Sequence, residues 1–264
     1  MVHIVLVESN TPDIVAAGLS AATPFRDTFS ALNMACSVSV VEPYAQPCDP
    51  GVLDEADGVV LTGSGVRWAV DDARAKPLAD LAEQVFDRGL PVWGSCNGMQ
   101  LAAVLLGGTV RVSPNGRETG FARSVVLTEQ GQGHPMMAGR ETGYSVPCTH
   151  RDEVGTLPEG AELVAGNAHS PVQAFAYAKN GVDFWGAQYH PEFSAAFVAG
   201  LVAYRSDGSA ETQDLIDNLS RADTDPDFAR RMGGRADDLR LAVRATELRN
   251  WLAHVDFTKS PTQM

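Results

Sequence analysis

Cysteine is scarce in this sequence, and the cysteines that occur are not paired. The 264 residues contain four, at positions 36, 48, 96 and 148. Without a CxxC pair or a dense cysteine framework, the sequence indicates neither a structural zinc site nor a disulfide-stabilised fold. No two histidines have metal-ligand spacing either. We therefore expect no metal ion, no cofactor and the reduced thiols of a cytoplasmic protein.

Basic residues are also in the minority, with 20 Lys and Arg against 33 Asp and Glu and a net charge of -13. This excess of negative charge repels polyanions, so we expect neither nucleic acid nor an anionic membrane as a partner. The opening MVHIVLVESN has no basic stretch before its apolar run and reaches Glu8 at once, so we expect no secretory signal. The longest uncharged stretch, residues 89–110, contains Pro91 and several glycines and is better explained as a buried strand, a turn and a helix than as a membrane span.

Four apolar runs in the first half of the chain are continuous rather than alternating, at residues 3–7, 38–41, 58–62 and 90–93. Continuous apolar strands separated by helix-length segments predict a parallel sheet that is covered on both faces. Apolar residues at helical spacing in 78–86 provide the crossover helix that parallel neighbours need. We expect an α/β fold, doubly wound, with a mostly parallel central sheet and helices on both faces.

The pattern changes at about residue 109, where short strand candidates are separated by Pro, Gly and Asn turns. We interpret them as a small set of additional, partly antiparallel strands. They lie at 109–112, 121–127, 163–165, 172–178 and 182–188. The composition after Phe193 is helical. We therefore predict a domain at 1–204 and a helical C-terminal extension at 205–264 that packs on the same domain.

The strongest local signal is the segment 91–101, PVWGSCNGMQL, in which an apolar strand is followed by G-x-C-x-G and a helical run. A nucleophile on a sharp strand-to-helix turn needs small residues two positions before and after it, and Gly94 and Gly98 meet that need. Such a turn places the Cys96 sulfur at a helix N-terminus, where the dipole favours a thiolate. The alternative is a buried structural cysteine in a Gly-rich turn; the agreement of spacing and context favours a catalytic one.

A thiol nucleophile needs a base, and the base needs a group that orients it. His190 follows an apolar strand directly, and Glu192 lies two residues further on, with Pro191 stiffening the pair. The spacing favours a functional histidine over an ordinary loop residue. His150 is a weaker candidate, because a histidine next to Arg and Asp is usually part of a solvated turn.

Three sequence blocks resemble the class I (triad) glutamine amidotransferases: Leu61-Thr-Gly-Ser, Gly94-Ser-Cys-Asn-Gly-Met-Gln and Gln188-Tyr-His-Pro-Glu. Further similarity at 116–122 and 149–154 is to the glutaminase domain of GMP synthases and its free-standing relatives. The resemblance covers about residues 1–200, and it implies the flavodoxin-like fold of that family.

The resemblance also implies a chemistry. Cys96 would attack the side-chain amide of glutamine to give a γ-glutamyl thioester and ammonia, with His190 moving the proton and Glu192 orienting His190; water would then release glutamate. By the same match, the backbone around Gly63 and Ser64 and the N–H of Asn97 would hold the oxyanion. Gln100 would help to hold the substrate.

The sequence departs from the family pattern around the nucleophile. Asn97 stands where a bulky apolar or aromatic residue is usual, and Ser95 stands where an apolar residue is usual. The loop 63–68 is also unusual. Its Arg67 and Trp68 either line the pocket mouth and contact a group on the γ-amide, or serve as a surface lid residue and a packing anchor.

Three functions follow as hypotheses. The first is a glutamine-hydrolysing amidotransferase or glutaminase, with a small-molecule substrate. The sequence has no P-loop and no ATP-pyrophosphatase motif, so such an enzyme would pass ammonia to an acceptor or synthase on a separate subunit. The second is a γ-glutamyl hydrolase that acts on a substituted γ-glutamyl amide or peptide. The third is a non-catalytic regulatory module on the same fold.

Overall fold

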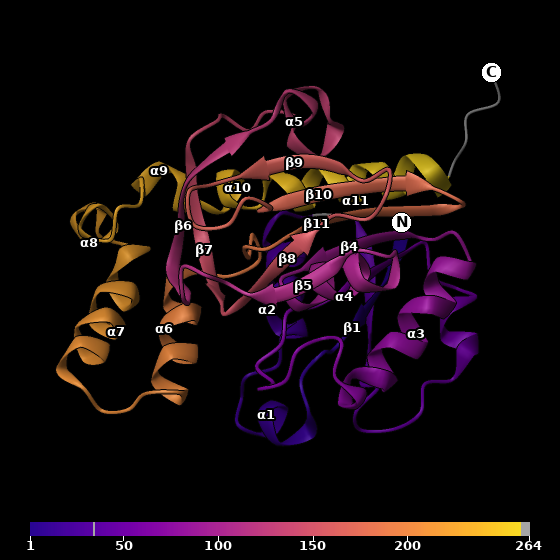
Figure 1. Cartoon of the computed structure of the whole chain (residues 1–264), viewed down its shortest axis with the longest axis horizontal. Coiled ribbons are helices and arrows are strands. Elements are labelled where there is room, and N and C mark those ends of the chain that lie inside the picture. The colour runs from indigo at the N-terminus through magenta and orange to yellow at the C-terminus, as the bar shows by residue number, and fades with distance from the viewer. Residues whose placement is uncertain (34, 260–264) are drawn as a thin grey trace.

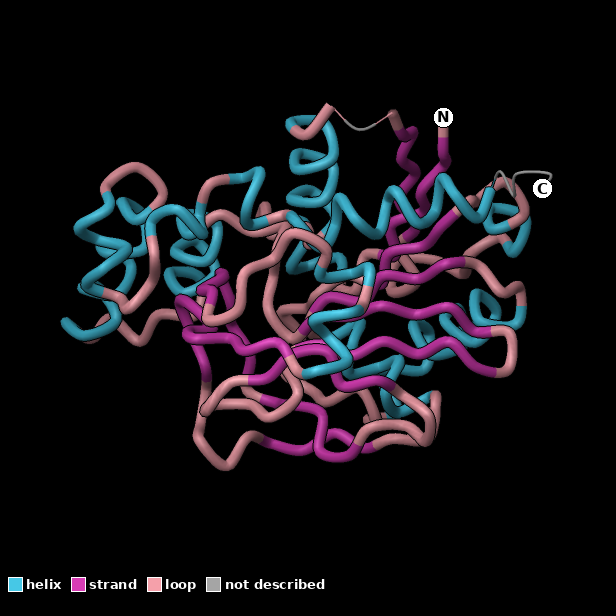
Figure 2. Tube along the Cα trace, turned by 90° about the horizontal axis from the view of Figure 1, so that it is seen from above, coloured by secondary structure: helices cyan, strands magenta, loops and turns pink. Residues whose placement is uncertain are grey.

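The computed structural model describes residues 1–33 and 35–259, so the last five residues of the predicted extension lie outside the described residues. Its centre is a nine-stranded sheet in the order β2-β1-β3-β4-β11-β10-β9-β6-β7. Helices cover both faces of this sheet (Figures 1 and 2). The predicted α/β class, with helices on both faces of a central sheet, is confirmed.

The four continuous apolar runs form the parallel part of the sheet, as predicted. They become β1 (Val2–Val7), β2 (Cys36–Val41), β3 (Gly58–Leu61) and β4 (Pro91–Ser95), and β11 (Val182–Ala187) joins β4 in parallel. Every residue of β3 and β4 is buried, because helices cover both faces of these central strands. The carboxyl ends of β3, β4 and β11 therefore meet at one edge of the sheet.

The antiparallel strands extend this same sheet beyond β11. A separate two-stranded sheet pairs β5 with β8. The strands of this half are β5 (Thr109–Val112), β6 (Glu118–Leu127), β7 (Tyr144–His150), β8 (Asp152–Thr156), β9 (Glu162–Gly166) and β10 (Ala174–Lys179). The sequence pattern did not predict β7 and β8. In β7, Pro147 and the polar residues Ser145 and Thr149 stand between the apolar residues Tyr144, Val146 and Cys148. The edge position of this strand tolerates the proline.

Two layers of helices complete the core. The buried side chains of α3 (Lys76–Asp87), which is the predicted crossover helix, and of α4 (Asn97–Leu105) share one apolar cluster with β3 and β4. Those of α2 (Ala22–Ala31) and α11 (Thr246–Lys259) pack in the cluster on the other face. The short segments are α1 (Pro12–Ala16), α5 (Glu129–Gly133), η1 (Pro50–Leu53), η2 (Ala73–Ala75) and η3 (Pro135–Met137).

The C-terminal part is helical as far as the structure describes it. One group of helices projects at one end of the molecule and forms its own cluster around Phe121 and Phe193 (Figure 1). α11 instead runs along the central sheet, where Trp251 and Val255 pack in the cluster that contains Ile4. The boundary at residue 204 stays a prediction. The remaining helices are α6 (Ala195–Tyr204), α7 (Ala210–Ala222), α8 (Pro226–Arg231), α9 (Ala236–Leu239) and α10 (Leu241–Arg244).

Residues 89–110 form β4, a turn, α4 and the start of β5, in agreement with the expectation of a buried strand, turn and helix. Within the described ranges, none of the helices combines the length and the apolar character that crossing a membrane requires.

Candidate active site

Cys96 lies on a strained turn between β4 and α4. Its backbone has φ 48° and ψ -100°, a conformation that residues with a side chain seldom adopt and that is frequent at functional sites. A Cβ at Gly94 would lie 2.8 Å from the Met99 amide nitrogen, and one at Gly98 would lie 2.1 Å from the Leu61 carbonyl oxygen. The turn therefore requires glycine at both positions, as the elbow predicted from the sequence does.

The loop that follows β11 brings His190 and Glu192 to this turn. Because β11 is the parallel neighbour of β4, the residues after the two strands emerge at the same sheet edge. His190 Nδ1 and Glu192 Oε1 are 2.7 Å apart, both side chains are buried, and the interaction with Cys96 contributes to the raised pKa of His190. The structure thus brings together the three residues that the sequence singled out.

The protonated form of His190 is stabilised by its surroundings. Burial lowers the pKa of the imidazole, but the charge of Glu192 and the hydrogen bonds with Cys96 and Glu192 outweigh that effect and raise the pKa to about 9. The ring stacks on Phe193, with centroids 3.9 Å apart and planes at 5°. On another side it lies against Gly63, where a Cβ would be 2.6 Å from His190 Cε1. These contacts hold the ring in one orientation.

The Glu192 carboxylate is oriented by a residue that the sequence reasoning did not assign to the site. Ser95 donates a hydrogen bond of 3.1 Å to Glu192 Oε2 and accepts one of 2.9 Å from the indole nitrogen of Trp93. Thr28 donates to the backbone carbonyl of Glu192 at 3.2 Å. The only sequence signal for this role was the polar residue at 95, where the family usually has an apolar one.

The predicted oxyanion donors lie around Cys96. The backbone N–H groups of Gly63 and Asn97 have no hydrogen-bond partner among the residues the structure describes. The Ser64 side chain donates to the backbone carbonyl of Ser9 at 2.6 Å, so it stabilises the loop, and Ser64 is one of the residues that line the cavity over Cys96. Oδ1 of the Asn97 side chain is buried without a partner in the described structure. It is a free acceptor beside the nucleophile.

Gln100 lies next to Cys96 in the structure, with its amide hydrogens already engaged. Its Nε2 donates to the Asp152 carbonyl at 2.7 Å and to Gln188 Oε1 at 3.0 Å. Gln188 in turn donates from Nε2 to the Cys96 sulfur at 3.3 Å. Gln188 is part of the block Gln188-Tyr-His-Pro-Glu, but no sequence pattern assigned it a role. The geometry makes Gln100 a support for Gln188, which contacts the sulfur directly.

A cavity of about 390 Å³ opens over Cys96. Arg67, Trp68, Asn97 and Gln100 are among the residues that line it. The Arg74 guanidinium covers the Trp68 ring at 4.7 Å, and Tyr44 packs edge-on to it at 6.1 Å. Trp68 is therefore anchored by packing, while Arg67 is exposed at the cavity.

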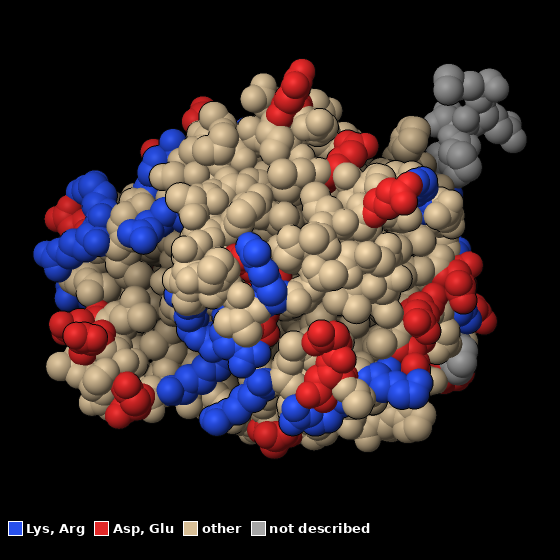
Figure 3. Space-filling view, in the orientation of Figure 1, with Lys and Arg blue, Asp and Glu red and all other residues tan. Residues whose placement is uncertain are grey.

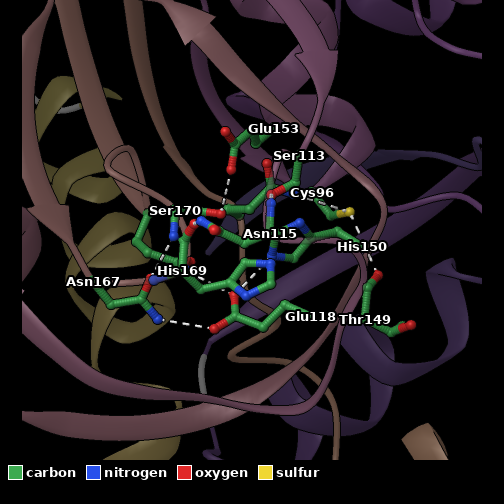
Figure 4. Close-up of polar contacts among 12 residues, drawn as sticks. Cys96, Ser113, Asn115, Glu118, Thr149, His150, Glu153, Asn167, His169 and Ser170 are labelled. Atoms are coloured by element: carbon green, nitrogen blue, oxygen red, sulfur yellow. Dashed lines mark hydrogen bonds and ion pairs between the residues drawn. The ribbon is translucent and has the colours of Figure 1, made fainter.

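A second polar network, centred on Glu118 and His150, lies near Cys96 (Figure 4), and His150 is one of the residues that line the cavity. His150 Nε2 is 2.8 Å from Glu118 Oε2, and Asn167 donates to Glu118 Oε1 at 2.9 Å. Glu118, His150 and Cys148 place ligand-type atoms within 4.8 Å of one another, but both oxygens of Glu118 accept hydrogen bonds in this network. The neighbour of His150, Thr149, accepts from the Cys96 sulfur at 4.0 Å. His150 therefore stabilises the wall beside Cys96 and does not contact the sulfur itself.

Comparison with known proteins identifies a matching family model and several similar proteins. A family model described as glutamine amidotransferase class-I matches residues 26–196. A gamma-glutamyl-L-1-hydroxyisopropylamide hydrolase from a Pseudomonas species is 39% identical over 191 residues, which are 67% of this chain and 64% of the relative. A glutamine-hydrolysing GMP synthase from Nitrosococcus oceani is 37% identical over 141 residues, 51% of this chain but 25% of the synthase. The chain thus matches less than two thirds of the length of either relative.

Solved structures share the fold. The crystal structure of a glutamine amidotransferase from Thermotoga maritima superposes with a TM-score of 0.66 at 21% identity, covering 96% of this chain and 97% of that one. A glutamine amidotransferase from Methylobacillus flagellatus gives 0.63 at 19% identity, covering 98% and 94%. With the family model matching well over half of the sequence, the chain belongs to the class I glutamine amidotransferases.

Proposed function

We propose that this chain hydrolyses γ-glutamyl amides through a covalent thioester on Cys96, with glutamine as the simplest substrate. The observation that carries the proposal is the placement of Cys96 on a strained elbow at the cavity, with the His190 and Glu192 pair behind it. A nucleophile, a proton carrier and an orienting carboxylate in this arrangement are the parts of a catalytic triad.

The reaction follows from the roles these atoms can take. The Cys96 sulfur attacks the amide carbon, and the N–H groups of Gly63 and Asn97 stabilise the oxyanion that forms. The imidazolium of His190 gives its proton to the departing nitrogen, and the C–N bond breaks to release ammonia. Water then attacks the thioester and gives a proton to the now neutral His190, the C–S bond breaks and glutamate leaves. The thiol is restored at the end of the cycle.

The γ-glutamyl hydrolase hypothesis is supported by a specific finding. The relative that shares 39% identity is named as a hydrolase of a substituted γ-glutamyl amide, and the cavity volume of about 390 Å³ falls in the range that holds whole small-molecule ligands. The reaction is the same, with an amine in place of ammonia as the leaving group. Supply of ammonia to a separate synthase subunit, which the GMP synthase relatives suggest, stays a further proposal, as does a cytoplasmic location suited to four free cysteines.

The test is release of glutamate, ammonia and amine from glutamine and a panel of γ-glutamyl amides by the purified chain. Cys96→Ala is the inactive control, and Cys48→Ala, which changes a thiol outside the cavity, is the matched active one. We expect turnover to be lost in Cys96→Ala and retained in Cys48→Ala. Full turnover by Cys96→Ala would disprove the mechanism. If the wild-type chain hydrolysed none of the amides, the result would favour the non-catalytic module.

A further inference from the structure

Four arginines line the cavity over Cys96, although the chain as a whole carries a net charge of -13. They come from four separate segments: Arg67 follows β3, Arg117 precedes β6, Arg151 joins β7 to β8, and Arg205 ends α6. Figure 3 shows the molecule in the orientation of Figure 1. Basic side chains gather in the lower part of the face displayed, below the position of the labels β6 and β7 in Figure 1. The cavity is thus a local basic region on an acidic protein.

Most of this positive charge is not neutralised by the protein. Arg151 is paired with Asp152 at 2.7 Å, and Asp152 is the one acidic residue among those lining the cavity. Arg67 and Arg117 make no ion pair with any residue that the structure describes, and Arg205 donates to the backbone carbonyl of Gly65 at 3.2 Å. Among the described residues, Arg67, Arg117 and Arg205 therefore line the cavity without a carboxylate partner.

These groups are close enough to repel one another. The pKa of Arg205 is lowered, first by its partial burial and then by the charges of Arg117 and Arg67, while Cys96 acts in the opposite direction. Gathering like charges costs free energy unless an anion is bound among them. Guanidinium groups are suited to that role because their planar fork matches a carboxylate.

The charge of glutamine does not account for this arrangement. Its glutamyl half carries one α-carboxylate and one α-ammonium group, so glutamine and γ-glutamyl amides of neutral amines bring no net negative charge. One guanidinium is enough for the α-carboxylate, which leaves two without an anion. The γ-amide itself has to lie at Cys96 for attack. An anion that pairs with the other two guanidinium groups must then be part of the amine half of the substrate.

We infer that the preferred substrates are γ-glutamyl amides whose amine half carries a carboxylate, such as γ-glutamyl amino acids, bound by Arg67, Arg117 and Arg205. This inference rests on the proposed function. Hydrolysis adds one water, breaks the amide C–N bond and yields glutamate and the free amino acid, whose nitrogen takes its proton from His190. The amine half differs in charge from the hydroxyisopropylamine named for the Pseudomonas relative.

The test compares γ-glutamylglycine with γ-glutamylglycinamide, two substrates that differ only in the terminal carboxylate. We expect kcat/KM for γ-glutamylglycine to be higher by roughly tenfold or more. A hydrogen bond to a charged group contributes more free energy than a tenfold change requires. The ratio should fall toward one in the Arg67→Gln, Arg117→Gln double variant and with added salt. Arg230→Gln, which changes an exposed arginine of α8 outside the cavity, should leave it unchanged.

A second measurement does not depend on turnover. Iodoacetate and iodoacetamide alkylate thiols alike but differ in charge, so the ratio of their rates at Cys96, located by mass spectrometry, reports the charge of the cavity. We expect the double variant to lower that ratio and Arg230→Gln to leave it unchanged. An unchanged ratio in the double variant would overturn the inference.

The failure of this inference differs from a failure of the proposed function. Turnover of glutamine that depends on Cys96, together with equal kcat/KM for the two glycine substrates, would overturn the inference and leave the proposed function standing. Absence of hydrolysis of any γ-glutamyl amide would remove the proposed function and the substrate inference with it.

Discussion

Ser95 and Glu192 are 97 positions apart in the chain, yet the Ser95 hydroxyl donates a hydrogen bond of 3.1 Å to Oε2 of the Glu192 carboxylate. The other carboxylate oxygen, Oε1, lies 2.7 Å from His190. Both carboxylate oxygens are therefore hydrogen-bonded, one to Ser95 at the end of β4 and the other to His190. The strand that carries the nucleophile also orients the acid that orients the histidine.

Replacing this hydroxyl should slow the chemical step. In Ser95→Ala, Glu192 loses a buried hydrogen bond to its charged group, an interaction worth about 1.5–3 kcal/mol. We expect kcat to fall roughly tenfold with little change in KM, measured as glutamate release at saturating substrate. Ser220→Ala, at an exposed position on α7, is the control, and Ser95→Thr should recover part of the activity. A raised KM with unchanged kcat would contradict the positioning role.

The raised pKa of His190 predicts the alkaline side of the pH profile. If the imidazolium donates the proton to the leaving nitrogen, kcat falls as the pH rises through about 9. Glu192→Gln removes the charge that raises this pKa, so the fall in kcat should move to lower pH and the maximum rate should decrease. The profile of kcat against pH for both proteins checks this. A fall at the same pH in both would show that His190 is not the titrating group.

The same shift links pH to stability. The pKa of His190 is higher in the folded protein than its ordinary value of 6.5, so its contribution is fully present below about pH 6.5 and is lost as the pH rises through about 9. At about 1.4 kcal/mol for each pH unit, this contribution is roughly 3 kcal/mol. We expect the free energy of unfolding, measured with urea, to decrease between these pH values. Glu192→Gln should flatten that decrease.

The backbone at the elbow predicts a contrast between two glycines. A Cβ at Gly98 would meet the Leu61 carbonyl at 2.1 Å, whereas Gly200, on the exposed side of α6, has nothing within 4 Å. Gly98→Ala forces β3 and α4 apart, and we expect it to cost about 1–3 kcal/mol of stability and most of the activity. Gly200→Ala should increase the free energy of unfolding by about 0.5–1 kcal/mol, because glycine weakens a helix interior. Thermal unfolding of both variants checks this, and a neutral Gly98→Ala would contradict the close packing.

Much of the parallel sheet and the elbow could be predicted because the signals there are local. Continuous apolar runs reflect strands buried on both sides, and the glycines around Cys96 reflect a backbone that excludes side chains. β7 was not predicted because Pro147 and polar residues interrupt its apolar positions, which an edge strand tolerates. The role of Ser95 and the convergence of Arg67, Arg117 and Arg205 depend on contacts between distant segments, and no local pattern in the sequence encodes these.

The C-terminal helix α11 is joined to the active-site loop through Glu247, and this connection predicts how the extension contributes to stability. Arg140 pairs with Glu247 where both side chains are almost fully buried, and Tyr189, the neighbour of His190, donates to Glu247 Oε1 at 2.7 Å. Glu247→Ala leaves the Arg140 charge buried and unpaired, which should cost about 3–5 kcal/mol. Breaking the exposed pair of Arg230 and Asp227 should cost at most about 1 kcal/mol.

Removing both charges tests whether the pair or the packing matters. In the double variant Arg140→Leu, Glu247→Leu no buried charge is left unpaired, so we expect a smaller loss of stability than in Glu247→Ala, measured by urea unfolding. The Tyr189 hydroxyl retains its contact with Tyr144 at 2.6 Å, so the loop should keep its position and most of the activity should remain. A double variant as unstable as the single one would show that α11 is held by this ion pair, rather than by the burial of Trp251 and Val255 against the sheet.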